Sequence, residues 1–307
     1  MKNFKIFYLA LIGTIALAVE SRAQQFPMYN QYIFNAYTIN PAEAGTRNYG
    51  TASFLHRFQW LGVNGAPTTS SFGLESNIGS SFGLGLNFIS DQIGSQSIQT
   101  LNIATGYHIK LTDKIRLATG LSLVANNETT NLSNLQNIYD PDDPDLQKVS
   151  SFSPNVGGGL LLYTEKLFIG LAIPRTIEYK ASNSNNFALD QVRHAFVYAG
   201  RAFYVTEQFQ FRPSVLLKVV SGAPAQMDFN AVLSYHRMID LGINYRSGDS
   251  AGIMAGITVK ERLTFNYVYE LPLSAFRFST VQNHEVGIRY RFGQSHFQSI
   301  QSPRFFN

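Results

Sequence analysis

The chain has 307 residues, with 24 lysines and arginines against 20 aspartates and glutamates, and it contains no cysteine. The absence of cysteine excludes both a disulfide framework and a lipid-modified N-terminal cysteine. The basic residues are scattered rather than gathered into a stripe, so we expect no nucleic-acid partner. Only 14% of the residues are charged, against about 25% in an average soluble protein.

Residues 1–23 have the form of a secretory signal peptide. Lys2 and Lys5 give a basic start, residues 7–19 form an apolar run, and a small-x-small cleavage site ends at Ala23. The apolar run is too short for a transmembrane helix, and no later stretch approaches the ~18 consecutive apolar residues that such a helix needs. We therefore expect an exported protein that is not a helical membrane protein.

Residues 24–47 precede the first predicted strand and are rich in Asn, Gln, Tyr and Phe, and the pair Asn40-Pro41 indicates a turn or a helix start. Two roles are open for this segment. It could seal the bottom of a barrel as a plug. Alternatively, its aromatic residues with polar neighbours could dock onto a partner, and the candidate partner-binding residues are then Tyr29, Tyr32 and Phe34.

Residues 48–293 repeat one unit about fourteen times: some ten residues of alternating apolar and polar side chains, followed by a turn. In the stretch 99–111, for example, Leu101, Ile103 and Tyr107 share one face, while Asn102 and Gly106 share the other. With so few charges, the apolar face fits lipid better than water. The pattern predicts an all-β fold, a transmembrane antiparallel β-barrel of about fourteen strands that begins near residue 48.

The connections between the predicted strands alternate in length. The odd-numbered ones are the longer set, at residues 60–67, 91–97, 127–152, 175–191, 221–225 and 271–282, and the even-numbered ones are tight, at residues 79–81, 112–114, 164–166, 206–207, 237–238 and 260–262. Outer-membrane barrels have short periplasmic turns and longer extracellular loops, so we expect both chain ends in the periplasm and an even number of strands. Residues 68–77 and 191–204 alternate poorly, which leaves twelve and sixteen strands as alternatives.

Two of the predicted extracellular loops contain candidate sites. Trp60, the single tryptophan, lies at the start of the first loop, as an aromatic anchor at the membrane boundary or as a contact to cargo. The acidic run 140–145 in the third loop has four carboxylates, which could collect calcium or simply be solvated. Because this run lacks the glycine and the distal glutamate of a calcium loop, we expect no metal site.

Residues 294–307 form a polar tail after the last strand. The tail contains Phe297, Phe305 and Phe306 among polar residues, as an interface with an apolar centre and a polar rim would. Because the periplasmic turns are too short to make a specific interface, the tail and residues 24–47 are the expected periplasmic docking surfaces.

No catalytic arrangement is present in the sequence. The six histidines do not have the spacing of a metal motif, and no phosphate-binding glycine loop occurs. We expect His108 and His236 on the polar face of strands, filling the lumen. The expectation is a protein that is not an enzyme and uses no cofactor, although a barrel enzyme can assemble its site from separate strands.

Three blocks in the first third of the chain resemble the PorP/SprF family of the Bacteroidetes type IX secretion and gliding motility apparatus. They are QFPMYNQYIFN at 25–35 with INPAEAGTR at 39–47, RFQWLG at 57–62 with GAPTT at 65–69, and GLGL at 83–86 with DQIG at 91–94. The first two blocks together are specific. Glu43 departs from the family's usual residue after Asn-Pro-Ala.

The resemblance implies a non-enzymatic outer-membrane component of protein secretion. Its partners would be periplasmic ring components of the type IX secretion system, the C-terminal domains of secreted surface adhesins, and the lipid of the outer membrane. The alternative function is an outer-membrane porin or a channel for hydrophobic substrates. Because glycines, apolar side chains and a long N-terminal segment indicate a narrow or blocked lumen, we favour the secretion component.

Overall fold

The computed structural model describes residues 35–131, 148–179, 191–273, 282–293 and 302. The predicted signal peptide 1–23 and the acidic run 140–145 lie outside these residues. Among the described residues, no helix is long and apolar enough to cross a membrane. The strands are β1 (Gly50–Phe58), β2 (Thr68–Ile78), β3 (Phe82–Ile93), β4 (Gln96–Lys110), β5 (Arg116–Thr130), β6 (Val149–Tyr163), β7 (Leu167–Ile173), β8 (His194–Arg201), β9 (Phe203–Tyr204), β10 (Phe209–Val220), β11 (Gln226–Tyr235), β12 (Ile239–Arg246), β13 (Ser250–Val259), β14 (Leu263–Pro272) and β15 (Asn283–Phe292).

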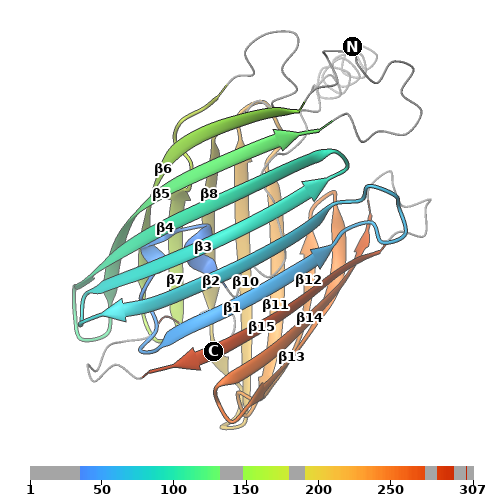
Figure 1. Cartoon of the computed structure of the whole chain (residues 1–307). Helices are drawn as coiled ribbons and strands as arrows, with labels where there is room; N and C mark the ends of the chain where they lie inside the picture. Colours follow the sequence, from blue (N-terminus) through green and yellow to red (C-terminus); the bar gives the residue numbers. More distant parts are fainter. Residues whose placement is uncertain (1–34, 132–147, 180–190, 274–281, 294–301, 303–307) are drawn as a thin grey trace, which may run out of the picture.

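The strands form one closed antiparallel barrel (Figure 1). Each strand pairs with its neighbours in sequence, and β1 pairs with β15 to close the wall. The short strand β9 continues β8, because both pair with β10 in one register, Gly200 opposite Ser214 and Phe203 opposite Phe211. Pro213 of β10 lies where β8 gives way to β9, and it has no N–H to donate to the ladder there. The barrel therefore has 14 strands, as the sequence predicted.

The two faces of the wall are those that the alternation predicts. On β4, Leu101 and Ile103 point outward and are 42% and 43% exposed, whereas Asn102 points into the lumen and is 7% exposed. A large apolar outer face suits lipid, and the interior is polar and filled. His108 lies inside as expected, but the prediction for His236 is wrong, since it lies in the turn after β11 with a positive φ of 49°.

The ends of the barrel differ, and we name them by their connections. The turn end carries the connections 79–81, 111–115, 164–166, 205–208, 236–238 and 260–262, together with the start of β1 and the end of β15; the loop end carries 59–67, 94–95, 131–148, 174–193, 221–225, 247–249 and 273–282.

One predicted loop is wrong. Residues 91–97 belong mostly to strands, because β3 runs to Ile93 and β4 begins at Gln96, with Gly94 at a φ of +56° in the tight turn. Asp91 is buried and accepts a hydrogen bond from Thr69 Oγ1. Polar side chains that face the lumen resemble a loop in the sequence, which explains the error.

The wall is irregular beside the loop-end half of β6. There β7 pairs only with Gly158 to Tyr163, and residues 174–177 take the place of a neighbouring strand. The Asn155 side chain replaces the ladder: its Oδ1 accepts from the N–H groups of Thr176 (2.9 Å) and Ile177 (3.0 Å), and its Nδ2 donates to Ile177 O (2.7 Å). Pro154 lies on this half of β6, where no strand needs its missing N–H.

Candidate functional site in the barrel lumen

The described part of the N-terminal segment, residues 35–47, lies inside the barrel, and we call it the plug segment (Figure 1). It forms two single turns of 3-10 helix, η2 (Ala36–Thr38) and η3 (Pro41–Glu43). Asn40 caps η3, since its Oδ1 accepts from Ala42 N at 2.9 Å, and Pro41 supplies a preset φ at the first helical position. Residues 35–44 are all buried.

Six glycines on the inner face of β2 to β6 form a bed for the plug segment. A Cβ built on Gly120 would lie 2.1 Å from Ala42 N, and one built on Gly83 would lie 2.1 Å from Ala44 O. Only glycine allows the plug backbone to approach the wall so closely. This glycine bed comprises Gly73, Gly83, Gly85, Gly106, Gly120 and Gly159.

Polar contacts hold the central turn of the plug segment to strands β6 and β8 of the wall. Asn40 Nδ2 donates to Leu160 O of β6 at 2.9 Å and to the Tyr198 hydroxyl of β8 at 3.0 Å. The Tyr198 hydroxyl in turn donates to Glu43 Oε1 at 2.8 Å. Glu43, the departure from the family pattern, thus accepts a hydrogen bond from the wall while 1% exposed.

The ends of the plug segment are held as well. Tyr37 donates from its hydroxyl to Leu86 O at 3.0 Å, and the His108 ring contacts Ala44 O through Nε2 at 2.7 Å. Gly45 N donates to Glu75 Oε1 at 3.1 Å. The described plug segment is therefore fixed along its length.

Apolar side chains fill much of the remaining lumen beside the plug segment. Ile39 and Ala42 of the plug belong to one buried apolar cluster with side chains of eight barrel strands. The other members are Ala118, Leu161, Tyr163, Phe168, Phe196, Tyr198, Leu216, Val232, Met254 and Val268. The interior at this level is a packed core, in which the burial of apolar surface favours the docked plug.

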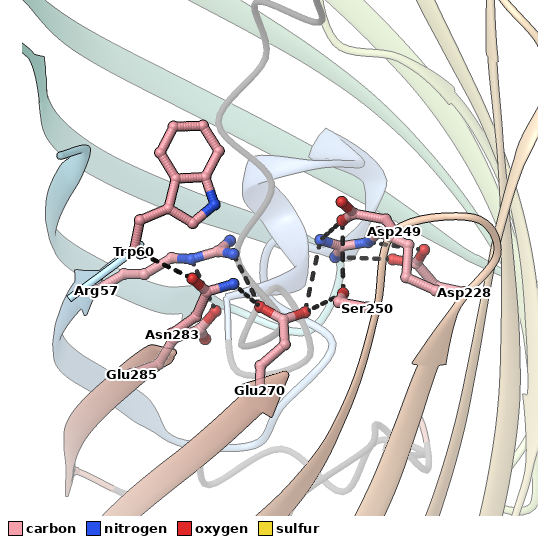
Figure 2. Close-up of polar contacts among 9 residues, drawn as sticks. Arg57, Trp60, Asp228, Asp249, Ser250, Glu270, Asn283 and Glu285 are labelled. Carbon is pink, nitrogen blue, oxygen red and sulfur yellow. Dashed lines mark hydrogen bonds and ion pairs between the residues drawn. The ribbon is translucent and has the colours of Figure 1, made fainter. Parts of the chain in front are cut away.

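A series of alternating charges crosses the lumen wall near the loop end (Figure 2). Arg57 of β1 contacts Glu270 of β14 at 2.9 Å and Glu285 of β15 at 3.5 Å. Arg246 of β12 contacts Asp228 of β11 at 3.0 Å and Glu270 at 3.9 Å. We call these five residues the charged ladder.

The charged ladder is almost completely shielded from solvent. Glu270 and Glu285 are 0% exposed and Arg246 is 2% exposed. Glu270 also accepts hydrogen bonds from Ser250 Oγ and from Asn283 Nδ2 (Figure 2). Since an unpaired buried charge is very costly, the alternation of signs keeps each acid compatible with burial. The ladder ties together strands from β11 round to β1 and favours a fixed wall there.

Of the residues predicted from sequence as partner contacts, only Trp60 lies in the described part of the chain. Its backbone N–H donates to Asn283 Oδ1 at 2.9 Å, and Leu61 N donates to Gln282 O at 2.9 Å, so the first loop is fastened to the start of β15. The remaining predicted residues, Tyr29, Tyr32, Phe34, Phe297, Phe305 and Phe306, lie outside the described residues.

Sequence reasoning missed the charged ladder. A usable signal was present, because Arg57, Asp228 and Glu270 occupy the polar phase of alternating strands in a chain with few charges. Lumen-facing charges inside predicted strands should have been expected to find partners on neighbouring strands. In the described part of the chain, no group of three or more His, Cys, Asp or Glu residues could hold a metal ion.

A closed antiparallel barrel with an apolar outer face, a polar interior and short turns at one end is an outer-membrane β-barrel. The profile of the type IX secretion system membrane protein family PorP/SprF matches residues 21–290. The chain belongs to this family. Among curated proteins, none matches the chain significantly.

Solved structures share the fold at low sequence identity. The CymD monoaromatic hydrocarbon channel superposes with a TM-score of 0.52 at 12% identity, covering 88% of this chain and 95% of that chain. The Ralstonia pickettii toluene transporter TbuX superposes with a TM-score of 0.51 at 12% identity, covering 90% of this chain and 97% of that chain. At such identities the likeness concerns the fold alone.

Proposed function

We propose that this protein is a non-catalytic, plugged barrel that serves the type IX secretion and gliding motility apparatus as an attachment point in the outer membrane. The observation that carries the proposal is the plug segment on its glycine bed. A general pore needs an open water-filled lumen, whereas this lumen holds the chain's own backbone against the wall. Membership in a secretion family supports the same reading.

In this proposal the turn end faces the periplasm. The tight turns there offer little surface, so contacts with periplasmic ring components fall on the chain ends, with Phe297, Phe305 and Phe306 of the tail as anchors. Residues 35–47 are occupied inside the lumen, which leaves docking by the N-terminal segment to Tyr29, Tyr32 and Phe34. The long connections of the loop end would meet the C-terminal domains of secreted adhesins.

The first test is a clean deletion strain scored for three phenotypes: surface display of adhesins, colony spreading and uptake of small solutes. The proposal expects the first two to fail while solute uptake is unchanged. A loss of uptake of small or hydrophobic solutes with normal adhesin display would instead identify a channel.

The second test distinguishes the roles proposed for the two ends of the barrel. Deletion of 294–307 should leave a heat-modifiable barrel in the outer membrane but weaken its co-purification with ring components. Shortening only residues 131–148, which lie between the ends of β5 and β6, should impair retention of adhesins instead. If the barrel without its tail is assembled and retains every partner at wild-type levels, the tail has no docking role.

A further inference from the structure

Two arginines lie directly opposite each other at the turn end of the barrel. Arg291 is near the end of β15, and its N–H donates to the carbonyl oxygen of Arg262, the residue before β14, at 2.8 Å. Residues directly opposite on antiparallel strands have Cβ atoms about 5 Å apart, and like charges in that position are destabilising. Among the described residues, neither arginine has an acidic partner. The fold therefore keeps two positive charges together at a cost in stability.

This pair belongs to the lumen side of the wall. Tyr290 is 46% exposed on the outer face of β15, so Arg289 and Arg291 on either side of it point to the lumen. Arg289 is 1% exposed, and the charges of Arg47 and Arg291 act on it. Arg262 is exposed at the rim, and Arg291 is half-buried. A lipid headgroup stays on the outer side of the wall, so the pair faces partners that approach through water.

Arg291 is held in place without being neutralised. Its guanidinium lies over the Tyr49 ring at 5.0 Å from the centroid, and such stacking orients the side chain. Its Nε and Nη2 are shielded from water and have no hydrogen-bond acceptor among the described residues. Shielded donors without an acceptor are costly. An oxyanion at this guanidinium therefore gains hydrogen bonds that the described residues leave unmade.

The neighbouring turns add charge in a backbone conformation that suits glycine. Lys260 and Glu261 have φ values of +50° and +56°. His236 and Arg237, in the turn before β12, have φ values of +49° and +56°. Glycine and asparagine adopt this left-handed conformation at the least cost. Because β12 and β13 pair side by side, Arg237 and Lys260 extend the positive rim that begins at Arg262, and Glu261 is the only acid of these two turns.

We infer that Arg237, Lys260, Arg262 and Arg291, which we call the basic mouth, form a docking site for an acidic segment of a partner protein. Aspartate or glutamate carboxylates meet the guanidinium groups of Arg262 and Arg291, which suit bidentate recognition. Charge complementarity sets the chemistry of the partner, and the lumen-side position favours a protein segment over a lipid. The tail follows β15 directly after Phe292, so the basic mouth adjoins the tail; the inference rests on the proposed function for a periplasmic source of the segment.

The test is binding of a fluorescent oligoglutamate peptide to the full-length barrel in detergent, followed by fluorescence polarisation. The wild type should bind this peptide and not a glycine-serine peptide of the same length. Binding should be lost between about 0.1 M and about 1 M sodium chloride, over which the Debye length falls from about 10 Å to about 3 Å. Binding of both peptides alike, or binding that salt does not weaken, would overturn the inference.

The result is separate from that of the proposed function, because the assay contains no secretion partner. If the peptide does not bind, the deletion strain can still lose adhesin display and colony spreading, and only the basic mouth is rejected. If the deletion strain is normal and the peptide binds, the proposed function fails and the anion-binding site stands.

Matched variants locate the site. The double variant Arg262→Gln, Arg291→Gln should weaken peptide binding by roughly tenfold, since an exposed ion pair contributes up to about fivefold. Lys114→Gln, Lys166→Gln removes two exposed positive charges from other turns of the same end and should change binding by less than about twofold. Because the arginine variant relieves the repulsion between opposed charges, its unfolding midpoint in a heating series on gels should not fall.

Two further measurements decide between this site and other occupants. Arg262→Gln alone, at an exposed position, should weaken binding by up to about fivefold even if the double variant does not fold. Equal weakening by the arginine and lysine variants would show attraction to net charge alone and overturn the inference. Displacement of the peptide by inorganic phosphate would identify a small-anion site, and displacement by phosphatidylglycerol but not by phosphatidylcholine would identify a lipid site; either result would overturn the assignment to a protein segment.

Discussion

Gly120 is the position where a single methyl group most directly tests the plug. An alanine Cβ there would lie 2.1 Å from Ala42 N and 2.3 Å from Pro41 C, although ordinary contact begins at 3.4 Å. Both atoms belong to the plug backbone, which cannot rotate away as a side chain could. Gly120→Ala must therefore lift η3 from the bed by about 1 Å or more.

That displacement breaks the hydrogen bonds that hold η3 and its N-cap residue Asn40 to the wall. These are the two that Asn40 Nδ2 donates to Leu160 O and the Tyr198 hydroxyl, and the one that this hydroxyl donates to Glu43. At about 1 kcal/mol for a neutral bond and about 2 kcal/mol for one to a carboxylate, up to about 4 kcal/mol of docking free energy is lost. The ratio of docked to released plug should fall by up to about a thousandfold.

The assay is steady conductance of the purified protein in planar bilayers. The wild type should conduct little, a variant lacking residues 24–47 should set the open level, and Gly120→Ala should show openings toward that level. Gly158→Ala is the matched control, because the nearest heavy atom to a Cβ there is 3.7 Å away. If the deletion variant conducts and Gly120→Ala remains as closed as Gly158→Ala, the glycine bed does not hold the plug.

Three further predictions concern orientation and the barrel wall. Epitope tags in 131–148 should be labelled on intact cells and tags after Gly293 should not; labelling of the C-terminal tag alone would reverse the orientation. Asn155→Ala should expose residues 174–177 to proteolysis at a local cost of about 3 kcal/mol, whereas Asn126→Ala, which removes the acceptor of one hydrogen bond of 2.7 Å from Thr100 Oγ1, should cost about 1 kcal/mol; equal protease sensitivity would contradict the role of Asn155. Arg57→Met should destabilise the barrel by about 3 kcal/mol, because two buried glutamates lose an ion pair, and an unchanged unfolding midpoint in a heating series on gels would contradict it.

The strand pattern could be predicted because it is local. Residues two apart share a face of a strand, so Leu101 and Ile103 reveal the lipid side without knowledge of any neighbour. The same local reasoning failed where polar residues had two possible explanations. Asp91 was placed in a loop because the sequence does not distinguish a lumen-facing carboxylate from a solvated one.

By itself, the sequence determined the barrel, the difference between its two ends and the family to which the chain belongs, and it predicted about fourteen strands with twelve and sixteen left as alternatives. Alternation, turn spacing and contiguous motifs are all written within short stretches of chain. Only the tertiary structure decided that Gly83 and Gly120 touch the plug segment, and that Arg57 lies between Glu270 and Glu285. Such contacts join residues tens to hundreds of positions apart, and their partners depend on strand register and closure of the wall, which no local pattern specifies.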